Sequence, residues 1–156
     1  LVENDTNVLN FSDNDAAILT AAWSKSYGIP RTMVFSVEPP QVSKRTESGE
    51  NLGRGAFVVR GQRTWIRDPA TTIALGLIRL DNEVLAVSGT IKGIQLICHR
   101  WITIQPGNKS KENIGKELSK ASGFTVDEFI SILPTNKIRL SDDYNLLKFQ
   151  KRDEEE

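Results

Sequence analysis

The sequence predicts an α+β fold, a single domain with a largely antiparallel sheet, an N-terminal helix and C-terminal helices. Three observations lead to this class: a capped helical pattern near the start, short apolar segments separated by turn residues in the middle, and two helical patterns before the end. Helices segregated from a run of strands are typical of α+β proteins. The length of 156 residues suits one domain. We expect that domain to span 1–150 and a charged tail to span 151–156.

The first helix is predicted to begin after Ser12. A serine at the N-cap followed by acidic residues in the first turn is a common helix start. Ile18, Leu19, Ala22 and Trp23 then fall on one face of the helix. We expect this face, Trp23 included, to be packed in the core. The glycine and proline at positions 28 and 30 end the helix.

The middle of the chain predicts a series of strands. Met33–Val37 is the first, and Pro39-Pro40 ends it. Ala56–Val59 and Thr64–Ile66 are two more, with a hairpin or bulge expected at Gly61 between them.

A second group of strands follows. Residues 72–80 and 84–88 are apolar runs separated by a polar turn, which predicts a hairpin. Residues 96–104 are rich in β-branched and aromatic side chains, which predicts a strand that ends at Pro106-Gly107. Both faces of this last strand are mixed, so alternation does not predict its buried side.

Two helices are predicted near the C-terminus. The first begins at Asn108 or Ser110, turns Ile114, Leu118 and Ala121 inward, and ends at a glycine at position 123. The second follows a capping box formed by residues 125 and 128 and stops before a proline at position 134. A short strand over 137–140 and a disordered tail after residue 150 complete the predicted order.

Composition argues against several classes of function. One cysteine and one histidine cannot form an intrachain disulfide or a closed zinc site, so we expect no metal and no cofactor. Cys98 and His99 are neighbours on a predicted strand and would point to opposite faces, which disfavours a catalytic pair. Gly53, Gly55 and Gly61 do not fit the spacing of a P-loop. These observations predict a protein without catalytic residues.

The sequence also bears on location. No apolar run is long enough to cross a bilayer and no signal peptide is recognisable, so we expect a cytoplasmic protein with no membrane partner. The chain opens at Leu1-Val2 without an initiator methionine, which is consistent with a fragment of a longer protein.

Charge is segregated along the chain although the formal total is zero. Residues 41–67 carry six basic side chains against two acidic ones, a local net charge of +4. Residues 92–120 carry six against two as well, whereas residues 1–15 sum to −4 and the tail 151–156 to −2. Segregated positive charge predicts an anionic partner. The glycines among these basic residues allow a backbone to approach such a partner closely.

The predicted contacts are therefore basic side chains that would neutralise RNA phosphates. The candidate RNA-binding residues are Lys44, Arg45, Arg54, Arg60, Arg63, Arg67, Lys109 and Lys111. The alternative for the first six is an ordinary solvated surface. The lysines of 109–120 equally fit a solvated helix face or a second phosphate contact. Trp65 and Trp101 have the chemistry to stack on unpaired bases, but packing on the sheet or in the core is the interpretation we favour.

The central motif resembles a known family. Gln41-Val42-Ser43-Lys44, then Ser48-Gly49-Glu50-Asn51-Leu52, then Gly55-Ala56-Phe57 ending in Arg60-Gly61-Gln62-Arg63 look like the C-terminal part of the NFACT-R domain. This is the RNA-binding domain of the NFACT family of ribosome-associated quality-control proteins. The alanine-rich helix before the motif and the lysine-rich segment Pro106–Leu118 fit the same family in order and spacing, so the likeness runs from about 12 to 135.

The resemblance implies a non-enzymatic RNA-binding module. Family members act on large ribosomal subunits that carry an obstructed nascent chain and recruit tRNA to tail it. The implied partners are tRNA or large-subunit rRNA and the large ribosomal subunit itself. Two positions depart from the usual motif: Asn51 replaces an aromatic residue and Arg45 replaces a threonine. The first half of the domain has no counterpart here, which leaves tRNA selection and tailing unassigned. The alternative function is a protein-interaction module that docks on ribosomal or quality-control proteins.

Overall fold

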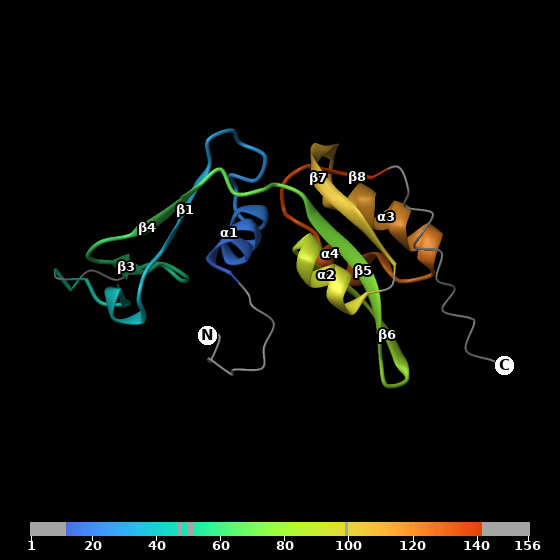
Figure 1. The fold of residues 1–156 in the computed structure, drawn as a ribbon, viewed down its shortest axis with the longest axis horizontal. Coiled ribbons are helices and arrows are strands. Elements are labelled where there is room, and N and C mark those ends of the chain that lie inside the picture. The colour runs from blue at the N-terminus through green and yellow to red at the C-terminus, as the bar shows by residue number, and fades with distance from the viewer. Residues whose placement is uncertain (1–11, 47, 50–51, 99, 142–156) are drawn as a thin grey trace.

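The computed structural model describes residues 12–46, 48–49, 52–98 and 100–141. Figure 1 shows two parts: a four-stranded sheet with helices on one side of the molecule, and a narrow two-stranded projection on the other, with α1 between them. The elements in chain order are α1 (Asp13–Ala22), β1 (Met33–Ser36), η1 (Pro39–Gln41), β2 (Val42–Ser43), β3 (Val58–Val59), β4 (Thr64–Arg67), β5 (Ile73–Leu80), β6 (Glu83–Gly89), α2 (Ile91–Ile97), β7 (Trp101–Lys109), α3 (Lys111–Ser122), α4 (Val126–Ile132) and β8 (Ile138–Leu140). The predicted α+β class is confirmed.

The larger sheet has the strand order β6-β5-β7-β8 and is antiparallel throughout. β5 and β6 form the predicted hairpin, in which Leu80 pairs with Glu83 across a two-residue turn. Asp81 opens that turn with φ 53°, in the left-handed region that Asp and Asn occupy more readily than most residues. Two shorter antiparallel ladders, β1 with β4 and β2 with β3, make up the projection.

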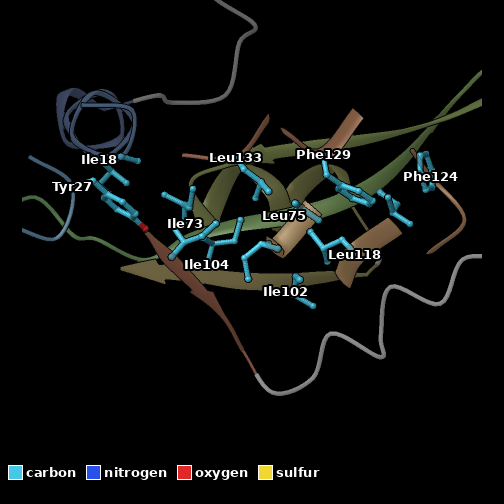
Figure 2. Close-up of a cluster of buried hydrophobic side chains, with 14 residues drawn as sticks. Ile18, Tyr27, Ile73, Leu75, Ile102, Ile104, Leu118, Phe124, Phe129 and Leu133 are labelled. Atoms are coloured by element: carbon cyan, nitrogen blue, oxygen red, sulfur yellow. The ribbon is translucent and has the colours of Figure 1, made fainter. Parts of the chain in front are cut away.

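The main core lies between one face of this sheet and the helices α1, α3 and α4. Alternate residues of β5, among them Ile73, Leu75 and Leu77, point into it. Figure 2 shows the cluster as a continuous row, with Ile18 and Tyr27 at one end and Phe124 at the other. The Tyr27 hydroxyl donates a hydrogen bond of 2.6 Å to the Thr71 carbonyl, and burial of this side chain raises the pKa of its phenol.

α2 covers part of the opposite face of the sheet. Ala74 of β5 packs there against Ile94 and Cys98. Gly76 makes this close packing possible, because a Cβ atom at that position would lie 2.7 Å from Cys98 Sγ and 3.1 Å from the Arg100 carbonyl oxygen. A β-strand glycine often marks such a close approach.

The helix starts agree with the predicted caps. The backbone N–H of Ser12 donates to the Asp15 carboxylate at 3.0 Å and its hydroxyl at 2.7 Å, and these bonds hold the pKa of Asp15 below its usual value. Ser110 rather than Asn108 caps α3, and Gly123 ends that helix with φ 76°. Thr125 and Glu128 form the predicted capping box of α4. Of the predicted inward residues of α3, Ile114 and Leu118 are buried, whereas Ala121 is half-buried and its neighbour Ser122 takes the buried position.

The predicted strand over 96–104 is wrong in its first half. Residues 91–97 form α2, and β7 begins only at Trp101. Thr90 caps α2 by accepting a hydrogen bond from the Gly93 N–H, and this local bond outweighs the β preference of the isoleucines. β7 also continues past Pro106 to Lys109, because an irregularity in the pairing with Ile138 accommodates the proline. The buried side, which alternation did not predict, is that of Ile102 and Ile104.

The predicted burial of Trp23 is also wrong. The helix ends at Ala22, and Trp23 stands at the C-cap with 39% of its surface exposed. The buried stripe of α1 runs instead through Ala17, Ile18, Ala21 and Ala22. The predicted apolar face runs one residue past the end of the helix, because Trp23 follows the last helical residue. The predicted tail after residue 150 lies outside the described residues.

Loss of the Phe129 ring tests whether this core carries the stability of the fold. Phe129 is fully buried and its ring meets that of Phe124 edge to face, with centroids 5.9 Å apart. We expect Phe129→Ala to lower the free energy of unfolding by about 3–5 kcal/mol, measured by urea denaturation. Phe57→Ala, the same change at a site that is 53% exposed, is the matched control and should change stability little. Equal effects of the two substitutions would contradict this assignment of the core.

Candidate nucleic-acid interface

The central basic motif folds into the two-stranded projection, which we call the arm and define as residues 33–67. β1 pairs with β4, from Met33 opposite Arg67 to Ser36 opposite Thr64. Farther along, β2 pairs with β3, with Val42 opposite Val59. Between these two ladders, the five residues 37–41 lie opposite the four residues 60–63. The pairing is therefore irregular at this point, which we call the step. The extra residue lies in the segment 37–41, which includes η1, and Gly61 lies opposite it, so the step divides the arm into an inner and an outer ladder.

Gln41 holds this step together. Its side-chain amide donates to the carbonyl oxygens of Arg60 at 2.8 Å and Gln62 at 2.6 Å. Its side-chain oxygen accepts a 2.8 Å bond from the Glu38 N–H, and its own carbonyl accepts from the Arg60 N–H at 2.9 Å. Three of these four hydrogen bonds connect the two sides of the arm where the regular ladders are interrupted.

Gly61 has a conformation that its neighbours in the strand do not share. Its φ is 82°, and a Cβ atom there would lie 2.9 Å from the side-chain nitrogen of Gln41. Both facts call for glycine, since other residues are strained at positive φ. The spacing of Gln41 and Gly61 in the sequence motif therefore has a structural cause, the contact that closes the step.

The two faces of the inner ladder differ. Val34 and Ile66 point to one face and are half-buried. Met33 is paired with Arg67, and Phe35 with Trp65, on the other face. Phe35 and Trp65 lie edge to face with ring centroids 5.2 Å apart, and they remain 39% and 50% exposed. Trp65 does pack on the sheet surface, as the favoured interpretation expected, but half of it faces solvent.

All six basic candidates of the arm are exposed: Lys44, Arg45, Arg54, Arg60, Arg63 and Arg67. Two of them lie on aromatic rings. The guanidinium carbon of Arg63 is 4.9 Å from the centroid of Phe35, and Nζ of Lys44 is 5.7 Å from that of Phe57. Both distances are within the range of a cation–π contact. Each pair fixes a cation at the surface of the arm without neutralising it.

Few acidic groups accompany these cations. Across residues 33–67 the sequence has six basic and three acidic side chains, a net charge of +3. Among the described residues of the arm, Glu38 is the single acid. The arm therefore presents a positive surface although the whole chain has no net charge.

The structure does not bring Lys109 and Lys111 to the same place. Lys109 ends β7 and Lys111 begins α3, and Figure 1 shows α3 at the opposite end of the molecule from β3. Nζ of Lys109 also forms an ion pair of 2.7 Å with the Glu117 carboxylate. Two separate basic regions thus exist, and the arm holds the larger number of exposed cations.

The described residues give less support to a metal site, a membrane-spanning helix or a reactive cysteine. Within the described ranges no cluster of three or more His, Cys, Asp or Glu residues is placed to hold a metal ion, and no helix is long and apolar enough to cross a membrane. Cys98 is buried, and burial raises the pKa of its thiol, which keeps it in the protonated, less nucleophilic form. His99 lies outside the described residues.

Two aromatic members of this surface were missed by sequence reasoning. Phe35 was read only as part of an apolar strand, and Phe57 likewise. A signal was present, because Arg63, Trp65 and Arg67 alternate with a period of two and must share a face of any strand. The pairing of that strand with Met33–Ser36 is what adds Phe35 to the same face.

The fold and the site thus define a small α+β protein that displays a basic, aromatic two-stranded arm. The chain is 36% identical over 116 residues to the archaeal Rqc2 homolog aRqcH of Methanocaldococcus jannaschii. This match shows that the chain is an NFACT-related protein, as the motif implied. It covers 72% of the chain but 17% of that relative's length. No protein-family model matches the chain, and no solved structure does.

The role of Gln41 is testable without any ligand. We expect Gln41→Ala to open the arm locally, because it removes three side-chain hydrogen bonds that contribute about 0.5–1.5 kcal/mol each. Amide hydrogen exchange should speed up across the arm while the four-stranded sheet keeps its protection. Gln62→Ala is the matched control, since its carbonyl remains available to Gln41. If both variants exchange like the wild type, Gln41 does not hold the step.

Proposed function

We propose that the chain is a non-enzymatic RNA-binding module, corresponding to the C-terminal part of an NFACT-R domain, in a cytoplasmic factor of ribosome-associated quality control. Its ligand is the phosphate backbone of tRNA or large-subunit rRNA, and its setting is the large ribosomal subunit. The relationship to an Rqc2 homolog supports the setting. The contacts themselves are argued from the chemistry of the arm.

The observation that carries the proposal is the exposure of six cations on an element that projects from the core. Lysine and arginine that neutralise phosphates release condensed counterions, which provides affinity without reading sequence. A narrow arm with charges along its length reaches more phosphates than a flat patch of equal charge, because an RNA backbone can follow it.

Arg60 and Arg63 are central to the proposed contact. They flank Gly61 at the irregular step, where Gln41 satisfies the carbonyl oxygens of residues 60 and 62. The Gln41 side chain thus bonds to the backbone on both sides of Gly61. Arginine presents a planar fork of donors that suits phosphate oxygens better than the point charge of lysine.

We expect the double substitution Arg60→Ala with Arg63→Ala to weaken RNA binding while the fold is retained. The measurement is fluorescence anisotropy of labelled tRNA at several salt concentrations, with duplex DNA as a comparison ligand. If both side chains contact phosphates, the slope of log K against log salt should become shallower by about 1.4–1.8. Circular dichroism of the variant should match the wild type. An unchanged affinity and slope would show that this site assignment is wrong.

Lys109 and Lys111 allow a comparison at equal charge. Lys109→Ala with Lys111→Ala removes the same two charges from the opposite end of the molecule. We expect a smaller loss of affinity than for the arginine pair, because Lys109 must give up its 2.7 Å ion pair with Glu117 before it can contact RNA. The same titrations measure it. A larger loss would move the main contact from the arm to the start of α3.

A second candidate function is docking on a ribosomal or quality-control protein. Exposed apolar side chains on and near α2 favour it: Leu80, Leu85, Leu96 and Ile97 are 38–56% exposed. Such a surface would bind a partner with little dependence on salt, whereas phosphate contacts weaken by orders of magnitude between low and moderate salt. Absence of tRNA binding at low salt, together with salt-insensitive binding to large subunits, would favour this candidate over the RNA-binding proposal.

A further inference from the structure

One face of the inner ladder carries a row of exposed rings and arginines. Phe35 and Trp65 form its centre, Arg63 lies 4.9 Å over the Phe35 ring on one side, and Arg67 with Met33 continues it toward the core. We call these five residues the aromatic row. Met33, Phe35 and Trp65 are 55%, 39% and 50% exposed, so none is used to build the core.

The exposure of this row calls for a partner. Single exposed apolar residues are ordinary, but a contiguous group on a projecting element is typical of an interaction site. On the opposite face of the same ladder, Val34 and Ile66 are half-buried, so the rings lie on the more exposed face of the arm. At the outer ladder the same chemistry recurs where Lys44 lies over Phe57, which is 53% exposed.

The chemistry of the aromatic row indicates which class of partner it can bind. Aromatic faces and guanidinium planes both stack on nucleobases, and adjacent cations hold the phosphates between them. Bases in a duplex are already stacked inside, and the deep, narrow major groove of A-form RNA does not admit side chains that read it. Only unpaired bases can reach rings fixed on a rigid strand in this way.

We propose that the aromatic row binds unpaired bases of single-stranded RNA, with Trp65 and Phe35 as the stacking surface and Arg63 and Arg67 at its two ends. This inference rests on the proposed RNA-binding function and specifies its ligand as a loop or end rather than a helix. Charge complementarity favours RNA over an apolar protein partner, because the arm has a net charge of +3.

The test uses the 156-residue chain with a labelled single-stranded uridine oligonucleotide and an RNA duplex of equal length. Trp65→Ala should weaken binding of the single strand by about 5- to 150-fold, the range that loss of one stacking ring produces. Binding of the duplex should change less than 3-fold. Trp65→Phe should restore most of the single-strand affinity, since its ring can still stack. Thr64→Ala, which changes the other face of the same strand, should bind like the wild type.

Tryptophan fluorescence supplies a readout that general loosening of the arm would not give. Stacking on a base should quench Trp65, and the quenching should disappear in Trp65→Phe while binding persists. Absence of quenching in the wild-type chain, or an unchanged single-strand affinity of Trp65→Ala, would overturn the inference, as would an equal loss of affinity for single strand and duplex. If Trp65→Ala binds normally but the Arg60 and Arg63 double variant does not, the stacking inference fails and the RNA-binding function stands. If neither variant changes binding, the assignment of RNA contacts to the arm fails as well, and absence of RNA binding by the wild-type chain would overturn the RNA-binding function itself.

Discussion

The fold depends on burial of β5 on both of its faces. Ile73, Leu75 and Leu77 fill the main core on one side, whereas Ala74 and Gly76 leave room for α2 and Cys98 on the other. β5 is also the strand to which β6 and β7 are hydrogen-bonded. The small residues Ala74 and Gly76 allow α2 and Cys98 to pack close to the sheet, and Ile78 packs beside them on the same face. The sheet thereby gains a covered second face from a helix of only seven residues.

The arm is built by different forces. None of its described side chains is fully buried, and it is held together by two short ladders, the Gln41 hydrogen bonds and the contacts among its rings. At its base, Arg31 and Asp68 both adopt positive φ, 60° and 45°, and the Asp68 N–H donates to the Thr32 carbonyl at 2.8 Å. Such conformations are uncommon for residues other than glycine. These two unfavourable backbone conformations occur where the arm leaves the core, and they set the direction in which the arm projects.

Sequence patterns predicted the elements whose ends are marked by local chemistry. The caps at Ser12, Ser110 and Thr125 and the β5–β6 turn are signals within a few residues, and all of them appear in the structure. The strand predicted over 96–104 rests on the β preference of its β-branched and aromatic residues, and its first two residues belong to α2, which the cap at Thr90 begins. The second error, Trp23, came from continuing a helical face beyond the last helical residue.

The site illustrates a further limit of sequence reasoning. The basic residues of the arm were recognisable one by one, because charge needs no knowledge of pairing. The aromatic row was not, because it depends on which strand lies beside β4. Phe35 and Trp65 are thirty positions apart, and the register that places them opposite each other is set by the whole hairpin. The step contains one more residue on one side of the arm than on the other, so the register changes between the two ladders. Residue pairs counted outward from Val42 and Val59 would therefore not match the pairs of β1 with β4.

The division of forces between core and arm has a consequence for function. A surface that must meet a large, irregular ligand gains from being separate from the core, since substitutions there change binding without a loss of hydrophobic burial. The arm satisfies this condition, because its rings and cations are exposed and its backbone is held by two ladders and the Gln41 hydrogen bonds rather than by a buried core. The same feature explains why the motif combines a glutamine, a glycine and alternating basic and aromatic residues. The first two shape the backbone, and the proposed RNA contacts come from the others.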